Sequence, residues 1–156
     1  LQIKNSGDFI TEISFVETQK KGNTGQQING NTNPSTPILK KCVEQLEAYF
    51  SGQSLQFNLS LSQEGTPFQQ TVWTELQKIP YGRTVSYLHL SKSLGNVKAI
   101  RAVGTANGKN NIVIIVPCHR VIGSDGKLVG YGGDLWRKHW LLEHEAKFAN
   151  GVQHLF

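Results

Sequence analysis

The sequence predicts an α+β protein, with a small sheet-plus-helix domain at residues 1–62 and a mostly helical domain at residues 66–156. Apolar and polar residues alternate in two short segments of the first part, the period of two that is typical of strands. Thr36-Pro37 and Thr66-Pro67 each place a helix-capping residue before a proline, which is favoured at the first helical position. The short polar connection 63–65 marks the predicted domain boundary.

The first part is predicted to contain a strand, a helix and a second strand. Phe9–Val16 is the first strand, and the polar residues 19–35, rich in Gly and Asn, indicate a surface loop. A helix begins at Pro37 and ends before Gly52, and the second strand follows it. The apolar residues of these three elements are Phe9, Ile13 and Phe15; Ile38, Leu39, Cys42, Val43, Leu46 and Phe50; and Phe57, Leu59 and Leu61.

The second part opens with a helix from Pro67, followed by a turn at 80–82. Two short helices, 85–94 and 97–107, then meet at a turn in which Asn96 caps the second helix. This pattern is typical of a helix-turn-helix and equally of an ordinary helical hairpin. The β-branched run Ile112–Val116 predicts a buried strand or extended segment, and a glycine-rich loop leads from it to a last helix at about 135–146. Its predicted core contacts are Leu135, Leu141 and Leu142.

The amino-acid composition limits the classes of protein to which this chain can belong. Hydrophobic residues make up 38% and charged residues 17% of the 156, which indicates a globular protein rather than a disordered one. No apolar run approaches the roughly 18 residues that a membrane span needs. The two cysteines are too few for a disulfide framework or a cysteine-based zinc site, and a reducing, intracellular compartment is the expectation.

Positive charge is concentrated in the second part. Residues 1–70 hold five Lys and six acids, a net charge of −1, whereas residues 71–156 hold eleven Lys or Arg and five acids, a net charge of +6. No acid lies between Glu75 and Asp125. Such a stretch attracts polyanions such as nucleic acid, although a solvated basic surface is a common alternative.

Cys118-His119-Arg120 is the strongest candidate for chemistry. A cysteine held by the preceding proline needs a base or a nearby positive charge to become a thiolate, because the pKa of a free thiol is about 8.5. His119 is the candidate base, and Glu145 on the last helix is the candidate carboxylate that orients it. The alternative is a buried, inert cysteine, which is the interpretation favoured for Cys42 on its apolar helical stripe.

The residues around this tripeptide resemble the 6-O-alkylguanine-DNA alkyltransferase family. The resemblance covers residues 36–146 and is strongest from 66 to 145. It is carried by Gly65-Thr66-Pro67-Phe68-Gln69, Val72-Trp73, Ile79-Pro80-Tyr81-Gly82, Ser86-Tyr87, Arg101-Ala102-Val103-Gly104, Ala106-Asn107-Gly108, Asn110, Ile114, the specific run Pro117-Cys118-His119-Arg120-Val121-Ile122-Gly123, Gly126, Gly130-Tyr131, Gly133, Leu135, Lys138, Leu141-Leu142 and Glu145.

The resemblance implies a ribonuclease H-like first domain and a second domain with a helix-turn-helix and the active site. It implies that an alkyl group moves, once per molecule, from the exocyclic oxygen of a flipped-out guanine to Cys118. By the same resemblance His119 is the base, acting through a water, and Glu145 orients it. Asn110 braces the loop beside the thiolate, and the Tyr87 hydroxyl serves the guanine and helps to protonate the leaving oxygen.

The remaining site residues are also implied by the resemblance. The carbonyls of Cys118 and Val121 accept from the guanine amino group, and Arg101 fills the gap left by the flipped base. The substrate-binding set is Val121, Tyr131, Gly132, Gly133 and Lys138, of which Tyr131 and Gly132 form a lid and Lys138 supports it. The DNA-binding set is Ala99, Ile100, Arg101, Ala102, Gly104 and Arg120, whose small residues suit a helix in the minor groove.

The family further implies double-stranded DNA containing alkylated guanine as partner, a monomer, no membrane association and no cofactor. The zinc seen in some members draws on cysteines that this chain lacks, so no metal is expected. The expected location is the cytoplasm, with the nucleoid if the source is bacterial. Three positions depart from the family pattern: Asn111 replaces a proline, Asp134 replaces a second lid glycine and is a candidate cap for the last helix, and Ile100 is bulkier than the alanine of some relatives.

Two other functions stay open on the sequence. A DNA-binding module that senses lesions without chemistry explains the basic stretch, but not the combination of Cys118, His119 and Glu145. A cysteine hydrolase explains Cys118 and His119, but not Arg101 or the absence of acids around it. Turnover separates them, because a hydrolase cycles whereas an alkyltransferase stops at one equivalent.

Overall fold

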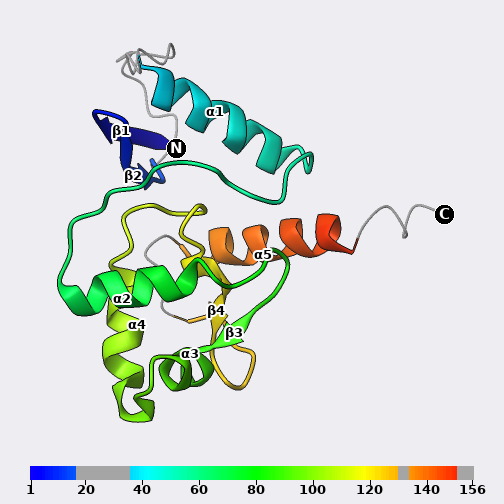
Figure 1. The fold of residues 1–156 in the computed structure, drawn as a ribbon. Helices are drawn as coiled ribbons and strands as arrows, with labels where there is room; N and C mark the ends of the chain where they lie inside the picture. Colours follow the sequence, from blue (N-terminus) through cyan, green and yellow to red (C-terminus); the bar gives the residue numbers. More distant parts are fainter. Residues whose placement is uncertain (17–35, 130–133, 151–156) are drawn as a thin grey trace, which may run out of the picture.

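The computed structural model describes residues 1–16, 36–129 and 134–150. Figure 1 shows a first unit, made of a strand hairpin and α1 (Pro37–Phe50), above a second unit of shorter helices. The α+β class predicted from the sequence is confirmed. One hydrophobic core runs through both units, since it includes Ile10 and Cys42 of the first and Val72 and Leu141 of the second.

The first unit contains one strand more than predicted. β1 (Gln2–Ser6) pairs antiparallel with β2 (Phe9–Ser14), and its polar sequence gave no apolar alternation to detect. The pairing shifts register between Lys4 and Asn5, so that Ile10 and Ile13 both face inward. Phe9, predicted on the inner face with Ile13, is instead 48% exposed because of this shift.

The second predicted strand, at 57–61, forms only an isolated bridge. Leu61 pairs with Ile10 in a parallel bridge, and the Ile10 N–H donates to the Ser60 carbonyl at 2.9 Å. Phe57, Leu59 and Leu61 are half-buried and alternate with exposed residues, as predicted. The segment is therefore extended along β2 without forming a full ladder.

The helices begin where the capping signals indicated. The Thr36 hydroxyl accepts from the Leu39 N–H at the start of α1, and Thr66 forms a capping box with Gln69 at the start of α2 (Pro67–Leu76). The indole N–H of Trp73 on α2 donates to the Ala106 carbonyl at 2.8 Å. This bond fastens α2 to α4 (Ile100–Gly108), the helix implied to bind DNA.

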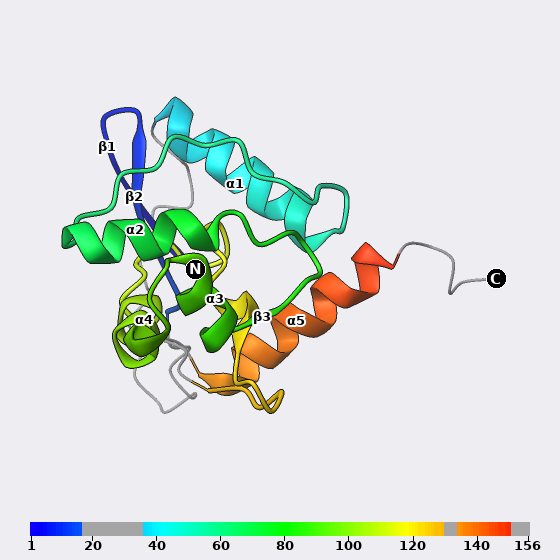
Figure 2. The ribbon, with the colours of Figure 1, turned by 60° about the horizontal axis from the view of Figure 1, so that its bottom comes forward.

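The predicted helix pair is a helix-turn-helix of α3 (Tyr87–Ser93) and α4, and Figure 2 shows α3 beside α4. Gly95 turns the chain with a φ of 77°, and the Asn96 side chain accepts from the Lys98 N–H. The start of the second helix differs from the prediction, because Val97–Ala99 forms a 3₁₀ turn, η1, before α4 begins.

Two short elements and a long helix complete the second unit. β3 (Val85–Ser86) pairs in parallel with β4 (Val121–Ile122), which follows the 3₁₀ turn η2 (Cys118–Arg120). The last helix, α5 (Leu135–Ala149), buries Leu141 as predicted, whereas Leu135 is 48% exposed. Within the described ranges, no helix is long and apolar enough to cross a membrane.

Residues 112–116 are buried as predicted, except for the half-buried Ile115, but they are not a strand. The Val116 N–H donates to the Ile112 carbonyl at 3.0 Å, which closes a compact turn. Ile114 adopts a φ of 73°, a left-handed conformation that is rare for a β-branched residue. The predicted extended segment is therefore corrected to a tight buried loop that delivers the chain to Cys118.

Candidate active site

Cys118 lies at the start of η2, directly after this loop. Its side chain is only 2% exposed, and its N–H donates to the Val116 carbonyl at 2.8 Å. The sulfur accepts a hydrogen bond from Asn110 Nδ2 at 3.2 Å. The backbone of Cys118 is thus fixed by the Val116 carbonyl, and its sulfur is fixed by an N–H of the Asn110 amide.

Asn110 organises the loop as well as touching the sulfur. Its Nδ2 donates to the Val116 carbonyl at 2.9 Å and to the Ile112 carbonyl at 3.3 Å, while its Oδ1 accepts from the Ile112 N–H at 3.1 Å. One side chain therefore satisfies backbone groups at both ends of the turn. This bonding compensates for the unfavourable backbone conformation of Ile114.

The thiol is protonated at rest. Burial raises the pKa of Cys118, and the Asn110 hydrogen bond and the positive charge of Lys138 oppose that shift only in part. A buried thiolate without a base would be unfavourable, because its charge has lost contact with water. Reaction at Cys118 therefore requires a proton acceptor near the sulfur.

His119 has the properties of such an acceptor. It is fully buried, and burial lowers its pKa, so the imidazole is neutral. Its Nε2 lies 2.7 Å from Glu145 Oε1; because an ionised carboxylate only accepts, this nitrogen carries the proton. Nδ1 then has a free lone pair, and it makes no hydrogen bond to any described residue.

Glu145 is the centre of the buried polar network. It accepts from Tyr49 Oη at 2.8 Å, from Arg120 Nε and Nη2 at 2.9 Å each, and from the Gly82 N–H at 3.2 Å. Burial alone would raise the pKa of its carboxyl, but the hydrogen bonds from His119 and Arg120 hold that pKa below its ordinary value. Glu145 is therefore ionised, and it fixes the tautomer and position of His119.

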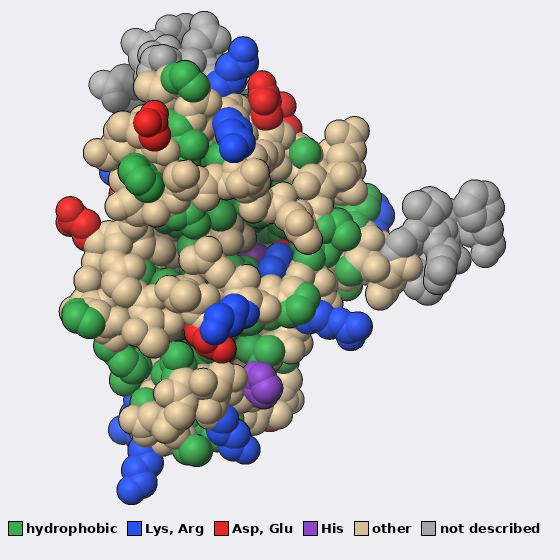
Figure 3. Space-filling view, viewed as in Figure 1, with side chains coloured by type: hydrophobic (Ala, Val, Ile, Leu, Met, Phe, Trp, Pro, Cys, Tyr) green, Lys and Arg blue, Asp and Glu red, His purple; other side chains and the backbone are tan. Residues whose placement is uncertain are grey.

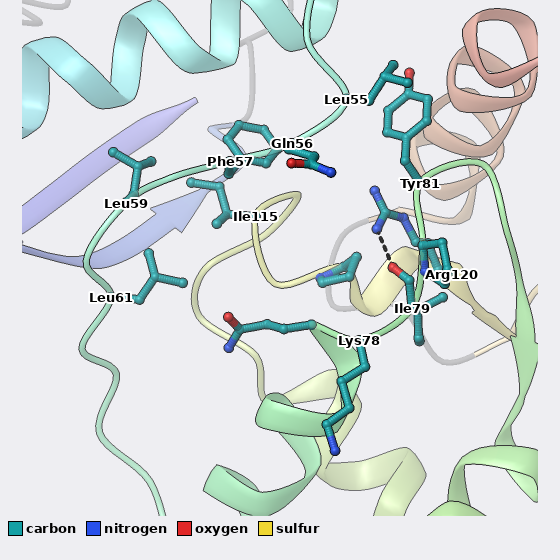
Figure 4. A pocket seen from close by; sticks show the side chains of 13 residues that line it. Leu55, Gln56, Phe57, Leu59, Leu61, Lys78, Ile79, Tyr81, Ile115 and Arg120 are labelled. Atoms are coloured by element: carbon teal, nitrogen blue, oxygen red, sulfur yellow. Dashed lines mark hydrogen bonds between the residues drawn. The ribbon is translucent and has the colours of Figure 1, made fainter.

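Two cavities flank this network. The larger, of about 530 Å³, lies between the units and is lined by apolar residues together with Tyr81, Arg120 and the polar residues Gln56, Gln77 and Lys78 (Figure 4); the surface is hollowed there in Figure 3. Cys118 is not among its lining residues. The second, of about 460 Å³, is lined by Cys118 and Asn110 together with residues of β2 and Arg137.

Comparison with known proteins decides the family. The model "6-O-methylguanine DNA methyltransferase, DNA binding domain" matches residues 67–147, and the corresponding "ribonuclease-like domain" matches residues 1–63. The chain belongs to the 6-O-methylguanine DNA methyltransferase family. The methylated-DNA–protein-cysteine methyltransferase of Mycobacterium leprae is 52% identical over 93% of this chain and 85% of that protein. The constitutive enzyme of Bacillus subtilis is 43% identical over 85% of this chain and 80% of its own length.

Solved structures of the family have the same fold. The crystal structure of Mycobacterium tuberculosis OGT in complex with DNA is 42% identical, with a TM-score of 0.79 over 94% of this chain and 86% of that one. An O6-methylguanine DNA methyltransferase structure from Methanococcus jannaschii is 25% identical, with a TM-score of 0.67 over 93% of this chain and 87% of that one.

One site assignment of the sequence analysis needs correction. Arg120, assigned to the DNA-binding set, is only 7% exposed. Besides its two bonds to Glu145, its Nη1 donates to the Ile79 carbonyl at 2.7 Å (Figure 4). A buried guanidinium paired in this way is not available to a phosphate, so Arg120 belongs to the buried network around Glu145.

Tyr87 and Lys138 converge on the segment that precedes the predicted lid. Tyr87 Oη donates to the Val129 carbonyl at 2.9 Å, and Lys138 Nζ donates to the carbonyls of Val121 and Val129 at 2.6 and 2.9 Å. Burial lowers the pKa of Lys138 to about 8. The Val121 carbonyl, implied to bind guanine, thus already has one donor and retains a second lone pair. The lid residues Tyr131, Gly132 and Gly133 lie outside the described residues.

Most of the implied DNA-binding set lies on α4. Ile100, Arg101 and Ala102 are exposed there, and Gly104 faces the ring of Tyr87, which lies 3.9 Å from the position of an added Cβ. Ala99 belongs to η1 and is half-buried. The lower end of the molecule, where α3 and α4 lie in Figure 1, carries several Lys and Arg side chains in Figure 3.

Two of the positions at which this chain departs from the family pattern, Asp134 and Asn111, make contacts that the structure shows. Asp134 occupies the N-cap position of α5, but its carboxylate accepts from the side chains of Trp136 and Arg137 rather than from the helix backbone. The predicted side-chain cap is therefore wrong. Asn111 replaces a proline that has no N–H, and here its N–H donates to Gln63 Oε1 at 2.8 Å.

Sequence reasoning missed three residues that contact the site. Tyr49 reaches Glu145 from α1, Asn107 donates from Nδ2 to the Cys118 carbonyl at 3.3 Å, and Gln63 donates to Asn110. Asn107 was part of the family motif without an assigned role. Tyr49 and Gln63 carry no motif, so only the folded chain reveals them.

Proposed function

We propose that this chain repairs DNA by moving an alkyl group from the exocyclic oxygen of 6-O-alkylguanine to Cys118, once per molecule. The observation that carries the proposal is the arrangement at the sulfur. Asn110 donates to it, and the next residue is a buried, neutral His119 whose Nε2 is held by Glu145. This combines a nucleophile, a base and an orienting carboxylate in one buried site.

The chemistry balances as a single displacement. His119 Nδ1 takes the thiol proton, through a water as the family resemblance implies, and the thiolate attacks the alkyl carbon. A sulfur–carbon bond forms while the carbon–oxygen bond breaks with its electron pair on the guanine. That guanine takes up one proton to become the normal base; Tyr87 is the proposed donor and regains a proton from water, while His119 releases the thiol proton to water. The thioether at Cys118 is stable and the alkyl group is not removed from the sulfur, so each protein molecule reacts only once.

Recognition of DNA is proposed for α4. Arg101 is exposed on this helix, and its planar guanidinium is suited to replace part of the stacking lost when a base is flipped out. Ala102 and Gly104 are small enough for a narrow minor groove. We place the domain boundary at residues 63–65 and propose that the chain acts as a monomer in the cytoplasm, with the nucleoid if the source is bacterial.

The decisive test is the intact mass of the protein after incubation with duplex DNA that contains one 6-O-methylguanine. The proposal expects one methyl in place of one hydrogen on each chain, mapped to Cys118, with no further gain under excess DNA. Absence of any mass gain, together with tight binding to the same duplex, would instead indicate a lesion-binding protein without chemistry. Continuous release of product would indicate a hydrolase.

Arg101→Ala is expected to slow transfer on duplex DNA by about tenfold and on single-stranded DNA far less, because only the duplex needs the gap filled. Lys98→Ala, an exposed change in the neighbouring turn, is the control. It should weaken the binding of both substrates through lost charge but leave both transfer rates unchanged at saturating DNA. Single-turnover rates at saturating DNA measure the difference. Equal slowing of both substrates by Arg101→Ala would contradict the gap-filling role.

A further inference from the structure

Gln63 links the connection between the two units to the active-site loop. Its side chain is half-buried, and its Nε2 donates to Asn110 Oδ1 at 3.1 Å. Its Oε1 accepts from the Asn111 N–H at 2.8 Å, which fixes the direction of the Gln63 amide itself. Both ends of this amide are therefore bonded to consecutive residues that lie immediately before the loop leading to Cys118.

The Gln63 bond matters because the Asn110 amide has two chemically opposite ends. Nδ2 donates to Cys118 Sγ, whereas Oδ1, if turned toward the sulfur, would place a partial negative charge against a thiolate. Two donors hold Oδ1 away from the sulfur, the Gln63 Nε2 and the Ile112 N–H, each at 3.1 Å. The first of these comes from a side chain outside the loop.

We propose that Gln63 is a positioning residue for the transfer reaction, because it holds the Asn110 amide in the orientation that donates to the Cys118 sulfur. This inference rests on the proposed function and extends it to the connection between the units. Gln63 does not touch the sulfur; it acts only through Asn110. Its loss should therefore alter the thiol itself, in addition to any effect on DNA repair.

The charged and titratable groups that affect the thiol come from several elements. The positive charge of Lys138 on α5 favours a thiolate at Cys118, and the negative charge of that thiolate raises the pKa of Tyr87 on α3. His119 follows Cys118 directly in the chain. The two hydrogen bonds of the Gln63 amide, to Asn110 and to Asn111, involve none of these three residues. A change at Gln63 should thus shift the thiol through Asn110 alone.

The test compares Gln63→Glu and Gln63→Leu with the unsubstituted side chain. Glutamate keeps an acceptor for the Asn111 N–H but cannot donate to Asn110 Oδ1, while leucine removes both bonds. Both variants should raise the pKa of Cys118 by about one unit and slow transfer by about tenfold, since the hydrogen bond to the charged form is weakened. The thiol pKa is measured without DNA, from the rate of alkylation by iodoacetamide against pH.

Two features of the chain sharpen this experiment. Cys42→Ala removes the second thiol, which is fully buried and whose pKa burial raises to about 11, so the alkylation reports on Cys118. Gln45→Glu is the matched control, because the Gln45 amide also bonds a backbone N–H and a carbonyl, those of Asn58, with no link to Asn110. The control should keep the unsubstituted thiol pKa and transfer rate.

The outcomes separate this inference from the proposed function. An unchanged thiol pKa in both Gln63 variants overturns the positioning role, even if the variants unfold more easily or react more slowly. A raised thiol pKa with Gln45→Glu unaffected supports it. If the unsubstituted protein fails to take a methyl group from DNA, the proposed function fails, while the shift of the thiol pKa still reports whether Gln63 orients Asn110.

Discussion

Replacing Cys118 with alanine is expected to abolish methyl transfer completely while leaving the affinity for DNA within about twofold of the unsubstituted protein. The reason is that the sulfur is the only atom lost. Asn110 keeps its bonds to the Val116 and Ile112 carbonyls, so the loop retains its shape. The residues of α4 that are proposed to face DNA are exposed on a different element and are not disturbed.

The matched control for this change is Cys42→Ala. Cys42 is also fully buried, but it lies on α1 in the apolar core, away from the polar network. Its variant should still take up one methyl group per chain, with a loss of stability of about 1–2 kcal/mol from the small cavity. Intact mass and a binding titration on the same duplex measure both proteins. Methyl uptake by Cys118→Ala, or its loss in Cys42→Ala, would contradict the assigned nucleophile.

The elements that the sequence predicted best are those with local signals. The Thr-Pro pairs placed the starts of α1 and α2 correctly, because a cap and its helix are separated by only a few residues. The run at 112–116 was predicted as extended, since β-branched residues favour strands. Its turn is imposed by the side chain of Asn110, and a periodicity argument contains no information about such a bond.

The site was predictable where the family motif names its residues and not elsewhere. Asn110 bonds to the sulfur of Cys118 and His119 bonds to Glu145, while the roles that the resemblance implies for them stay predictions. Arg120 was misplaced because nothing near it in the sequence identifies its carboxylate partner, Glu145, which is 25 residues away. Long-range pairing of this kind depends on the packing of α5, which local composition cannot reveal.

The same limitation explains why the contribution of the first unit was missed. Tyr49 donates to Glu145 from a position 96 residues earlier, and Gln63 donates to Asn110 from a position 47 residues earlier. The motif that identified the site is strongest in the second unit. The contacts indicate that the first unit and its connection help to define the positions of the reactive groups, in addition to covering the core.

Glu145→Ala should be the most destabilising single change in the active site, costing about 3–5 kcal/mol of unfolding free energy. The carboxylate accepts from Tyr49, Arg120, His119 and the Gly82 N–H, and its removal leaves the buried Arg120 guanidinium without a counter-charge. Urea unfolding followed by circular dichroism measures the loss. Because the cost arises from the unpaired cation, the double variant Arg120→Leu/Glu145→Leu should be less destabilised than Glu145→Ala, which tests the explanation directly.

Glu145→Gln tests the catalytic role while keeping the size of the side chain and one accepting oxygen. It loses the charge that fixes the His119 tautomer, and it also leaves the buried Arg120 without a counter-charge, so the folded fraction is measured by circular dichroism alongside the rate. Transfer per folded chain should slow by about 100-fold or more, the scale of general base catalysis. Glu143→Gln on the same helix is the control, because Glu143 is exposed and pairs with the exposed His139. A rate equal to that of the unsubstituted protein in Glu145→Gln would contradict the role of the ionised Glu145 carboxylate in the reaction.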